Sequence, residues 1–145
     1  MCHHHQSENL SHIYKQIQQL DNSTRFVGIA NNLGRLIATA YRNSLTPLMN
    51  EQETSHYAIQ AVLRAATRED FESKIGRLEY SIGKYERLIR ATVPIRYFGT
   101  DDDNNDQNKY YYLLISFDLE KSAIVIDVIE DKIMQFVEKN KKNFG

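Results

Sequence analysis

The sequence predicts an α+β domain built on a single five-stranded, mostly antiparallel sheet with helices on both faces. Three observations predict it. The length of 145 residues fits one domain. Five short apolar or alternating stretches have the pattern of strands, and three longer stretches have apolar residues at helical spacing. The order is α-β-β-α-β-β-β-α. One domain should span residues 7–140, between tails at 1–6 and 141–145.

The first two strands predict a β-hairpin. Two apolar runs, residues 26–30 and 36–41, flank a turn rich in Asn and Gly. Gly34 lies in this turn, where a glycine can adopt positive φ without steric cost. We therefore expect residues 26–41 to fold back on themselves as two paired strands.

The first and middle helices are predicted from apolar spacing and capping residues. Ser7 is a candidate N-cap for a first helix that ends near residue 20. Asn50, with Glu53 three residues later, resembles a capping box. The middle helix should therefore span about residues 51–69.

Three strands are predicted in the second half of the chain. Residues 77–82 alternate between apolar and polar side chains, and Gly83-Lys84 would supply the turn that follows. Residues 89–96 also alternate, so one face of this strand should be buried. Pro94 cannot donate a hydrogen bond, which predicts an edge or a bulge there. Residues 110–117 are apolar on both sides, as expected for a central strand covered on both faces.

The chain should close with a helix over residues 119–140, with Asp118 as its candidate N-cap. Residues 123–129 are β-branched, so a sixth strand is the alternative. We favour the helix because apolar residues continue at helical spacing through Ile129 and Ile133.

Composition limits the possible classes of protein. The longest apolar run, residues 110–115, is far shorter than the roughly 20 residues of a membrane-spanning helix. The N-terminus lacks the apolar core of a signal peptide, so we expect a cytoplasmic protein. Cys2 is the single cysteine, which excludes an internal disulfide framework. The 18 basic and 19 acidic side chains nearly balance, so the chain is neither polybasic nor polyacidic.

Two segments resemble metal sites, and we expect neither to be one. The terminal run His3-His4-His5 is more typical of a polar tail. Asp101, Asp103 and Asn105 have the first spacings of a calcium-binding loop, but the glycine and glutamate that such a loop requires later are missing. We predict no metal and no cofactor.

Catalytic and nucleic-acid signatures are also weak. Gly83-Lys84 is followed by tyrosine, not by the Ser or Thr of a phosphate loop, and the sequence has no Gly-x-Ser-x-Gly motif. Four closely spaced basic residues could contact phosphate, but acidic residues lie between them: Arg64, Arg68, Lys74 and Arg77. We therefore expect no enzyme, and these features favour nucleic-acid binding only weakly.

The order of elements resembles the roadblock/LC7, or profilin-like, fold. Residues 27–38 are similar to the opening hairpin of that family, and residues 113–118 followed by a helix are similar to its last strand and closing helix. At closer range the chain resembles short archaeal proteins that share a domain of unknown function. That match runs from Pro47-Leu48 through Arg64 and ends on residues 113–117, with these positions between: Arg68, Phe71, Gly76, Tyr80 and Pro94-Ile95. The acidic insertion at 99–109 departs from the roadblock pattern.

The roadblock resemblance implies a role in protein assembly. Such domains form homodimers or heterodimers by pairing edge strands, and they dock on small GTPases or scaffold complexes. Our leading hypothesis is therefore a non-enzymatic interaction or regulatory module that acts as a homodimer. We expect its surface on the strand at 77–82 and the helix at 51–69, with these candidate contacts: Tyr57, Arg64, Arg68, Leu78 and Tyr80.

Two alternatives remain open. PAS-like ligand sensors share a similar order of elements, and they would need an apolar cavity of several hundred Å³ between the sheet and the helices. A nucleic-acid-associated regulator is the other alternative.

Overall fold

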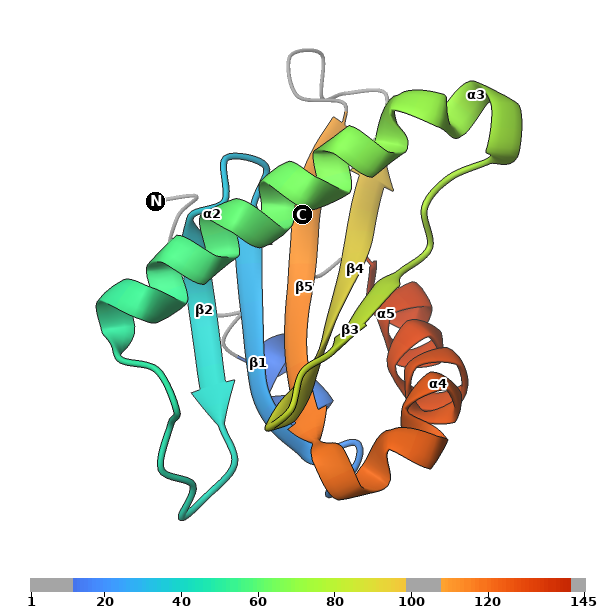
Figure 1. The fold of residues 1–145 in the computed structure, drawn as a ribbon. Coiled ribbons are helices and arrows are strands. Elements are labelled where there is room, and N and C mark those ends of the chain that lie inside the picture. Colours follow the sequence, from blue (N-terminus) through green and yellow to red (C-terminus); the bar gives the residue numbers. More distant parts are fainter. Residues whose placement is uncertain (1–11, 99–107, 142–145) are drawn as a thin grey trace.

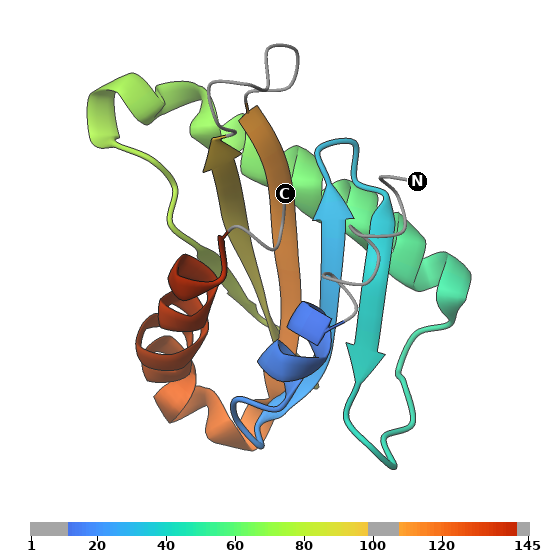
Figure 2. The same cartoon turned by 180° about the vertical axis from the view of Figure 1, so that it is seen from behind.

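A computed structural model of the chain describes residues 12–98 and 108–141. The predicted tail at 1–6, the cap at Ser7, the His3-His4-His5 run and most of the acidic insertion lie outside the described residues. The described part forms one five-stranded antiparallel sheet with helices on both faces (Figures 1 and 2). The predicted fold class is therefore confirmed.

The sheet has the strand order β2-β1-β5-β4-β3, so the last strand in the sequence lies at its centre. All neighbouring pairs are antiparallel. The prediction of a central strand near residues 110–117 is confirmed. The strands are β1 (Thr24–Asn31), β2 (Leu36–Tyr41), β3 (Ser81–Lys84), β4 (Leu88–Phe98) and β5 (Asn108–Asp118).

Each face of the sheet has its own apolar core. The helix α2 (Glu51–Arg68) crosses one face, and Figure 1 shows it in front of the strands. Figure 2 shows residues 12–18 and the C-terminal helical segments on the other face. The α2 core is rich in small residues and includes Phe26, Ala58, Ala61, Ala65 and Leu114. The opposite core is larger and more branched, and includes Ile17, Ile29, Leu113, Ile129 and Ile133.

The hairpin prediction is confirmed in detail. Gly34 adopts φ 85° in the turn between β1 and β2, and its N–H donates to the carbonyl of Asn31 over 2.9 Å. The Asn31 side-chain oxygen accepts hydrogen bonds from the backbone N–H groups of Leu33 and Arg35, each over 3.0 Å. A Cβ on Gly34 would come within 2.7 Å of the Ile59 Cα in α2. The turn therefore needs glycine for its backbone conformation and for its close contact with α2.

The middle helix begins as predicted. The Asn50 side chain accepts from the Glu53 N–H over 2.8 Å, and the Glu53 carboxylate accepts from the Asn50 N–H over 3.0 Å. This capping box satisfies two backbone donors at the start of α2. After α2 come two short helical turns, η1 (Glu69–Phe71) and α3 (Glu72–Ile75).

The strand predicted at 77–82 is wrong in position, and Gly83-Lys84 is not a turn. The observed β3 includes Gly83, which pairs with Arg90, and the tight turn instead joins Tyr85 to Leu88. If β3 continued backwards in the same register, Glu79 would lie opposite Pro94. Proline has no backbone N–H, so Pro94 cannot donate the hydrogen bond that would extend the β3–β4 ladder, and the ladder ends at Ser81. The prediction that β4 would reach an edge near Pro94 is confirmed.

The closing segment is helical, so the sixth-strand alternative is excluded. It is not one regular helix. It consists of η2 (Leu119–Ile124), α4 (Val125–Asp127), the wider π-helical η3 (Val128–Ile133) and α5 (Met134–Lys139). β-branched side chains lower helix propensity. The segment is nevertheless helical, because Val125, Ile129 and Ile133 are buried on the core side and hold it against the sheet. No helix in residues 12–98 and 108–141 is long and apolar enough to span a membrane.

Candidate interaction surface

The structure brings together three of the five residues that the sequence singled out. Arg68, Leu78 and Tyr80 line one groove at the β3 side of the sheet. Arg64 is exposed on α2 outside this groove. Tyr57 is only 7% exposed and lies in the α2 core, where burial raises the pKa of its phenol. The five residues therefore do not form one continuous surface, and their role in binding stays a prediction.

The groove that contains these three residues, which we call the β4-edge groove, has a volume of about 1510 Å³. It exists because β3 pairs with β4 only up to Thr92, which leaves the rest of β4 without a neighbour on that side. Its walls are the end of α2, α3, the segment 76–80 and α5. The Tyr80 hydroxyl donates to the Glu130 carboxylate over 2.5 Å, which fastens the segment 76–80 to the C-terminal helices.

Sequence reasoning missed the charged cluster beside this groove. Arg96 forms an ion pair with Glu72, and its Nε donates to the Tyr110 hydroxyl over 2.7 Å. Burial, with Glu69 close by, raises the pKa of both Tyr110 and Tyr112. The partners lie in η1, α3, β4 and β5, so they are close in space but far apart in sequence. This cluster fixes the short turns after α2 against the sheet.

A second groove, the β2-edge groove, lies at the opposite edge of the sheet and has a volume of about 750 Å³. It lies between β2 and the first half of α2, and β2 has no neighbour on its outer side within the described sheet. Ile37 and Tyr41 are 41% and 37% exposed on β2, and Ile59 is 53% exposed on α2. This edge therefore combines free backbone groups with exposed apolar side chains.

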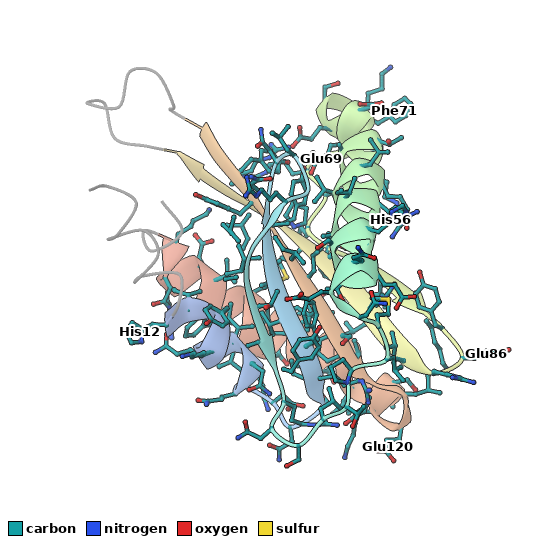
Figure 3. All side chains as sticks on the ribbon, turned by 90° about the vertical axis from the view of Figure 1, so that its left-hand side faces the viewer. His12, His56, Glu69, Phe71, Glu86 and Glu120 are labelled. Atoms are coloured by element: carbon teal, nitrogen blue, oxygen red, sulfur yellow. The ribbon has the colours of Figure 1, made fainter. Side chains whose placement is uncertain are left out.

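An exposed apolar stripe runs along the outside of α2 and continues through η1 and α3. We call it the α2 stripe and define it by Ile59, Leu63, Phe71 and Ile75, which are 53%, 66%, 62% and 82% exposed. Ile59 and Leu63 lie one turn apart on α2, and Phe71 and Ile75 follow beyond its end in η1 and α3. Figure 3 labels Phe71 just beyond the end of α2. The spacing was visible in the sequence, but it could not be distinguished there from a buried face.

A small pocket lies between α2 and the sheet, and we call it the α2 pocket. Its volume is about 40 Å³. The PAS-like alternative required an apolar cavity of several hundred Å³ in this region. The pocket is too small for that requirement, so the structure does not support a ligand sensor of that kind.

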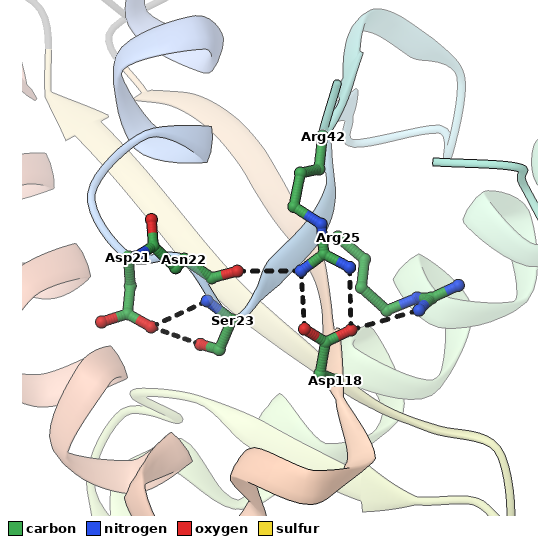
Figure 4. Close-up of polar contacts among 6 residues, drawn as sticks. All are labelled: Asp21, Asn22, Ser23, Arg25, Arg42 and Asp118. Atoms are coloured by element: carbon green, nitrogen blue, oxygen red, sulfur yellow. Dashed lines mark hydrogen bonds and ion pairs between the residues drawn. The ribbon is translucent and has the colours of Figure 1, made fainter. Parts of the chain in front are cut away.

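Asp118 does not cap the closing helix, contrary to the prediction. No capping hydrogen bond from its side chain is formed. Arg42 binds the carboxylate through two N–H groups, over 2.6 and 3.1 Å, and Arg25 adds a third contact over 3.2 Å (Figure 4). These hydrogen bonds, led by those from Arg42, lower the pKa of Asp118 although partial burial opposes the shift. The carboxylate therefore joins the ends of three neighbouring strands.

Nearby, Asp21 forms a second polar contact between the two ends of the chain. Partial burial would raise its pKa, but hydrogen bonds from Lys132 and Ser23 lower it to about 2. The Lys132 ammonium lies 2.7 Å from the Asp21 carboxylate. Asp21 and Asp118 both have structural partners, so neither has the features of a free catalytic acid.

The histidines of the described region do not form a site. His12 and His56 lie on opposite faces of the sheet (Figure 3). His56 is exposed at the start of α2, as predicted, and bonds with Gln60 over 3.1 Å. Within residues 12–98 and 108–141, no group of three or more His, Cys, Asp or Glu side chains could hold a metal ion.

Comparison by sequence finds no matching family model and no matching curated protein. Comparison by structure finds clear neighbours. The gliding protein MglB from Thermus thermophilus has a TM-score of 0.63 and 11% identity, with 96% of this chain and 87% of that chain covered. MglB in a tetrameric arrangement has a TM-score of 0.60 and 11% identity, over 94% and 85%. A Roadblock/LC7 domain from Streptomyces avermitilis has a TM-score of 0.52 and 8% identity, over 86% and 97%.

The chain has a roadblock/LC7-type fold. The predicted roadblock-like architecture is therefore confirmed at the level of fold. At 8–11% identity these neighbours establish the roadblock/LC7 architecture and nothing about partners. The archaeal resemblance is not tested by them.

Proposed function

We propose that this protein is a non-enzymatic interaction module that regulates a protein partner and acts as a homodimer. The α2 stripe carries the proposal. Large apolar side chains that gather on an exposed face are typical of a protein–protein contact. The roadblock/LC7 architecture supports the proposal, because a protein of the same fold, MglB, has been solved in a tetrameric arrangement.

The homodimer is tested by light scattering across micromolar concentrations. We expect the wild-type mass to be twice that of one chain. Leu63→Glu should shift the mass toward one chain, because it places a charge in the middle of the α2 stripe. Leu63 is 66% exposed, so this substitution should leave the fold intact. Gln135→Glu, which adds the same charge at an exposed position of α5, is the matched control.

Two results would count against the homodimer. A wild-type protein that stays monomeric at every concentration would remove it. Equal loss of mass in both variants would show that added charge, not the α2 stripe, controls association. The predicted contacts Arg68, Leu78 and Tyr80 in the β4-edge groove, and Arg64 outside it, remain part of the proposal and are the next residues to mutate.

A heterologous protein partner is the second part of the proposal. The roadblock resemblance suggests a small GTPase or a regulator of one. Co-purification of the untagged protein from its native cell, followed by mass spectrometry, would identify the partner. A genuine partner should be retained by the wild-type chain and by Gln135→Glu, and reduced with a variant on the contacting surface. A chain recovered alone would contradict this part.

A further inference from the structure

The α2 pocket combines apolar walls with a positively charged floor. It lies under the start of α2 and the connection from β2, and its walls include Phe26, Tyr41, Leu45, Leu48, Met49 and Tyr57. Three polar side chains from the sheet also line it: Arg25, Arg90 and Ser116. Arg90 and Ser116 face each other in the register of β4 and β5.

Arg90 has an unusual environment for a partly buried arginine. Its Cζ lies 3.7 Å from the centre of the Tyr57 ring and 5.4 Å from the centre of the Tyr85 ring. Its Nη2 donates to the Met49 sulfur over 3.0 Å. Stacking on the two tyrosine rings therefore holds the Arg90 guanidinium in place. Its hydrogen bond to Met49 is weak, because a thioether is a weak acceptor.

Other partly buried arginines of the described chain differ from Arg90 in one respect. Arg25, Arg42 and Arg96 each form an ion pair with a carboxylate. Among residues 12–98 and 108–141, no carboxylate lies within ion-pair distance of Arg90. The guanidinium therefore lines a pocket with donors that a ligand could use.

The size of the pocket limits what it can hold. A volume of about 40 Å³ has room for about three water-sized groups, at roughly 10–15 Å³ each. A carboxylate group is of this size, and its two oxygens match the fork of a guanidinium. The apolar walls would cover a short aliphatic stem.

We infer that the α2 pocket binds a carboxylate on a short aliphatic stem, with Arg90 as its counter-ion. This inference goes beyond the proposed function, because it does not depend on dimer formation. The chemistry fits two sources: a free short-chain acid, and the glutamate side chain of a partner protein. Arg25 adds positive charge nearby but is already bound to Asp118.

The test is a titration of ¹⁵N-labelled protein followed through the arginine Nε–Hε resonances and, in every variant, through the backbone N–H of Ser116, which lines the same pocket. Sodium propionate at constant ionic strength is the first probe, and propionamide is its neutral control. Propionate should shift the Arg90 resonance saturably, and propionamide should not. Arg90→Gln should weaken propionate binding at least tenfold, as expected for loss of a charge-assisted hydrogen bond. Arg87→Gln, in the exposed turn of the same hairpin, should bind normally.

Folding of Arg90→Gln is checked by circular dichroism. A second variant keeps the test valid if that protein is damaged. Leu48 is 54% exposed at the pocket, and Leu48→Glu should also weaken propionate binding, because its carboxylate repels or replaces the probe. No saturable shift at Arg90 up to about 50 mM propionate, well above millimolar affinity, overturns the inference. Equal binding by Arg90→Gln and Arg87→Gln would also overturn it.

The two sources are separated by a second probe, N-acetylglutamate amide, whose side chain carries its single carboxylate. Binding of this probe as tight as that of propionate, lost in Arg90→Gln, indicates a glutamate side chain of a partner. Binding of propionate alone indicates a free acid. Neither result affects the homodimer proposal, because dimer formation is tested separately, by the mass of the protein in solution, and depends on the α2 stripe.

Discussion

Replacement of Asp118 by Asn should destabilise the protein by about 2 kcal/mol at pH 7. The Asp118 carboxylate accepts three N–H bonds, two from Arg42 and one from Arg25. Hydrogen bonds to charged groups contribute about 1.5–3 kcal/mol each, but this site is partly exposed. The side chains of Arg25, Arg42 and Asp118 are 17%, 32% and 15% exposed, so solvent screening reduces the sum to about the value of one such bond.

The assay is thermal and urea unfolding of the wild type, Asp118→Asn and a control. A loss of about 2 kcal/mol corresponds to a fall in Tm of about 4–8 °C in a chain of this size. Glu120→Gln removes a charge two residues away at an exposed position and should change stability by less than about 0.5 kcal/mol. A Tm for Asp118→Asn that matches the control would refute the reasoning.

The ion pair also predicts that the loss of stability caused by Asp118→Asn depends on pH. The pKa of Asp118 is lower in the folded state than the value of about 3.9 expected when unfolded. Its stabilising contribution is therefore complete above about pH 4 and is lost as the pH falls through the folded pKa. The difference in stability between wild type and Asp118→Asn should be constant from pH 7 to pH 5 and should shrink below pH 4. A difference that stays the same at pH 2 would contradict the ion-pair explanation.

Three further predictions concern stability and can be checked by urea unfolding. Gly34→Ala should cost at least about 2 kcal/mol, because it adds left-handed strain and a Cβ 2.7 Å from the Ile59 Cα. Gly76→Ala meets open space, but φ 90° and ψ 175° lie in a region that is essentially restricted to glycine, so backbone strain alone should cost about 1–3 kcal/mol. Asn50→Ala should cost about 1 kcal/mol through loss of the capping box. Ile129→Ala should cost about 2–5 kcal/mol, because Ile129 is fully buried, and a smaller loss would indicate that the π-helical turn relaxes into the cavity.

The order of elements could be predicted from the sequence because each signal is local. The Asn-Gly turn at Gly34, the capping box at Asn50 and the helical spacing through Ile129 and Ile133 all act over a few residues. The position of β3 could not be predicted, because it depends on which residue of β4 lies opposite. Pro94 ends that ladder from about 15 positions away in the sequence, which no local pattern reveals.

The candidate site was predicted less well than the fold. Helical spacing alone does not show whether Tyr57 faces the core or the surface. Only the packing of α2 shows that it is buried. Asp118 precedes a helix, as a cap would, but Arg42 and Arg25 reach it only once β1, β2 and β5 are side by side. Arg90 was not predicted as a site residue, because its lack of a carboxylate partner is visible only in the three-dimensional structure.

The central position of β5 has a consequence for the way the chain can assemble. The β1–β2 and β3–β4 hairpins share no ladder with each other in the described sheet, and β5 is the strand that bonds to both. During synthesis each hairpin can form as soon as it emerges, but no strand ladder joins the two halves until residues 108–118 have been made. A nascent chain released before that point would carry two separate hairpins with open edges, and it would be prone to aggregate.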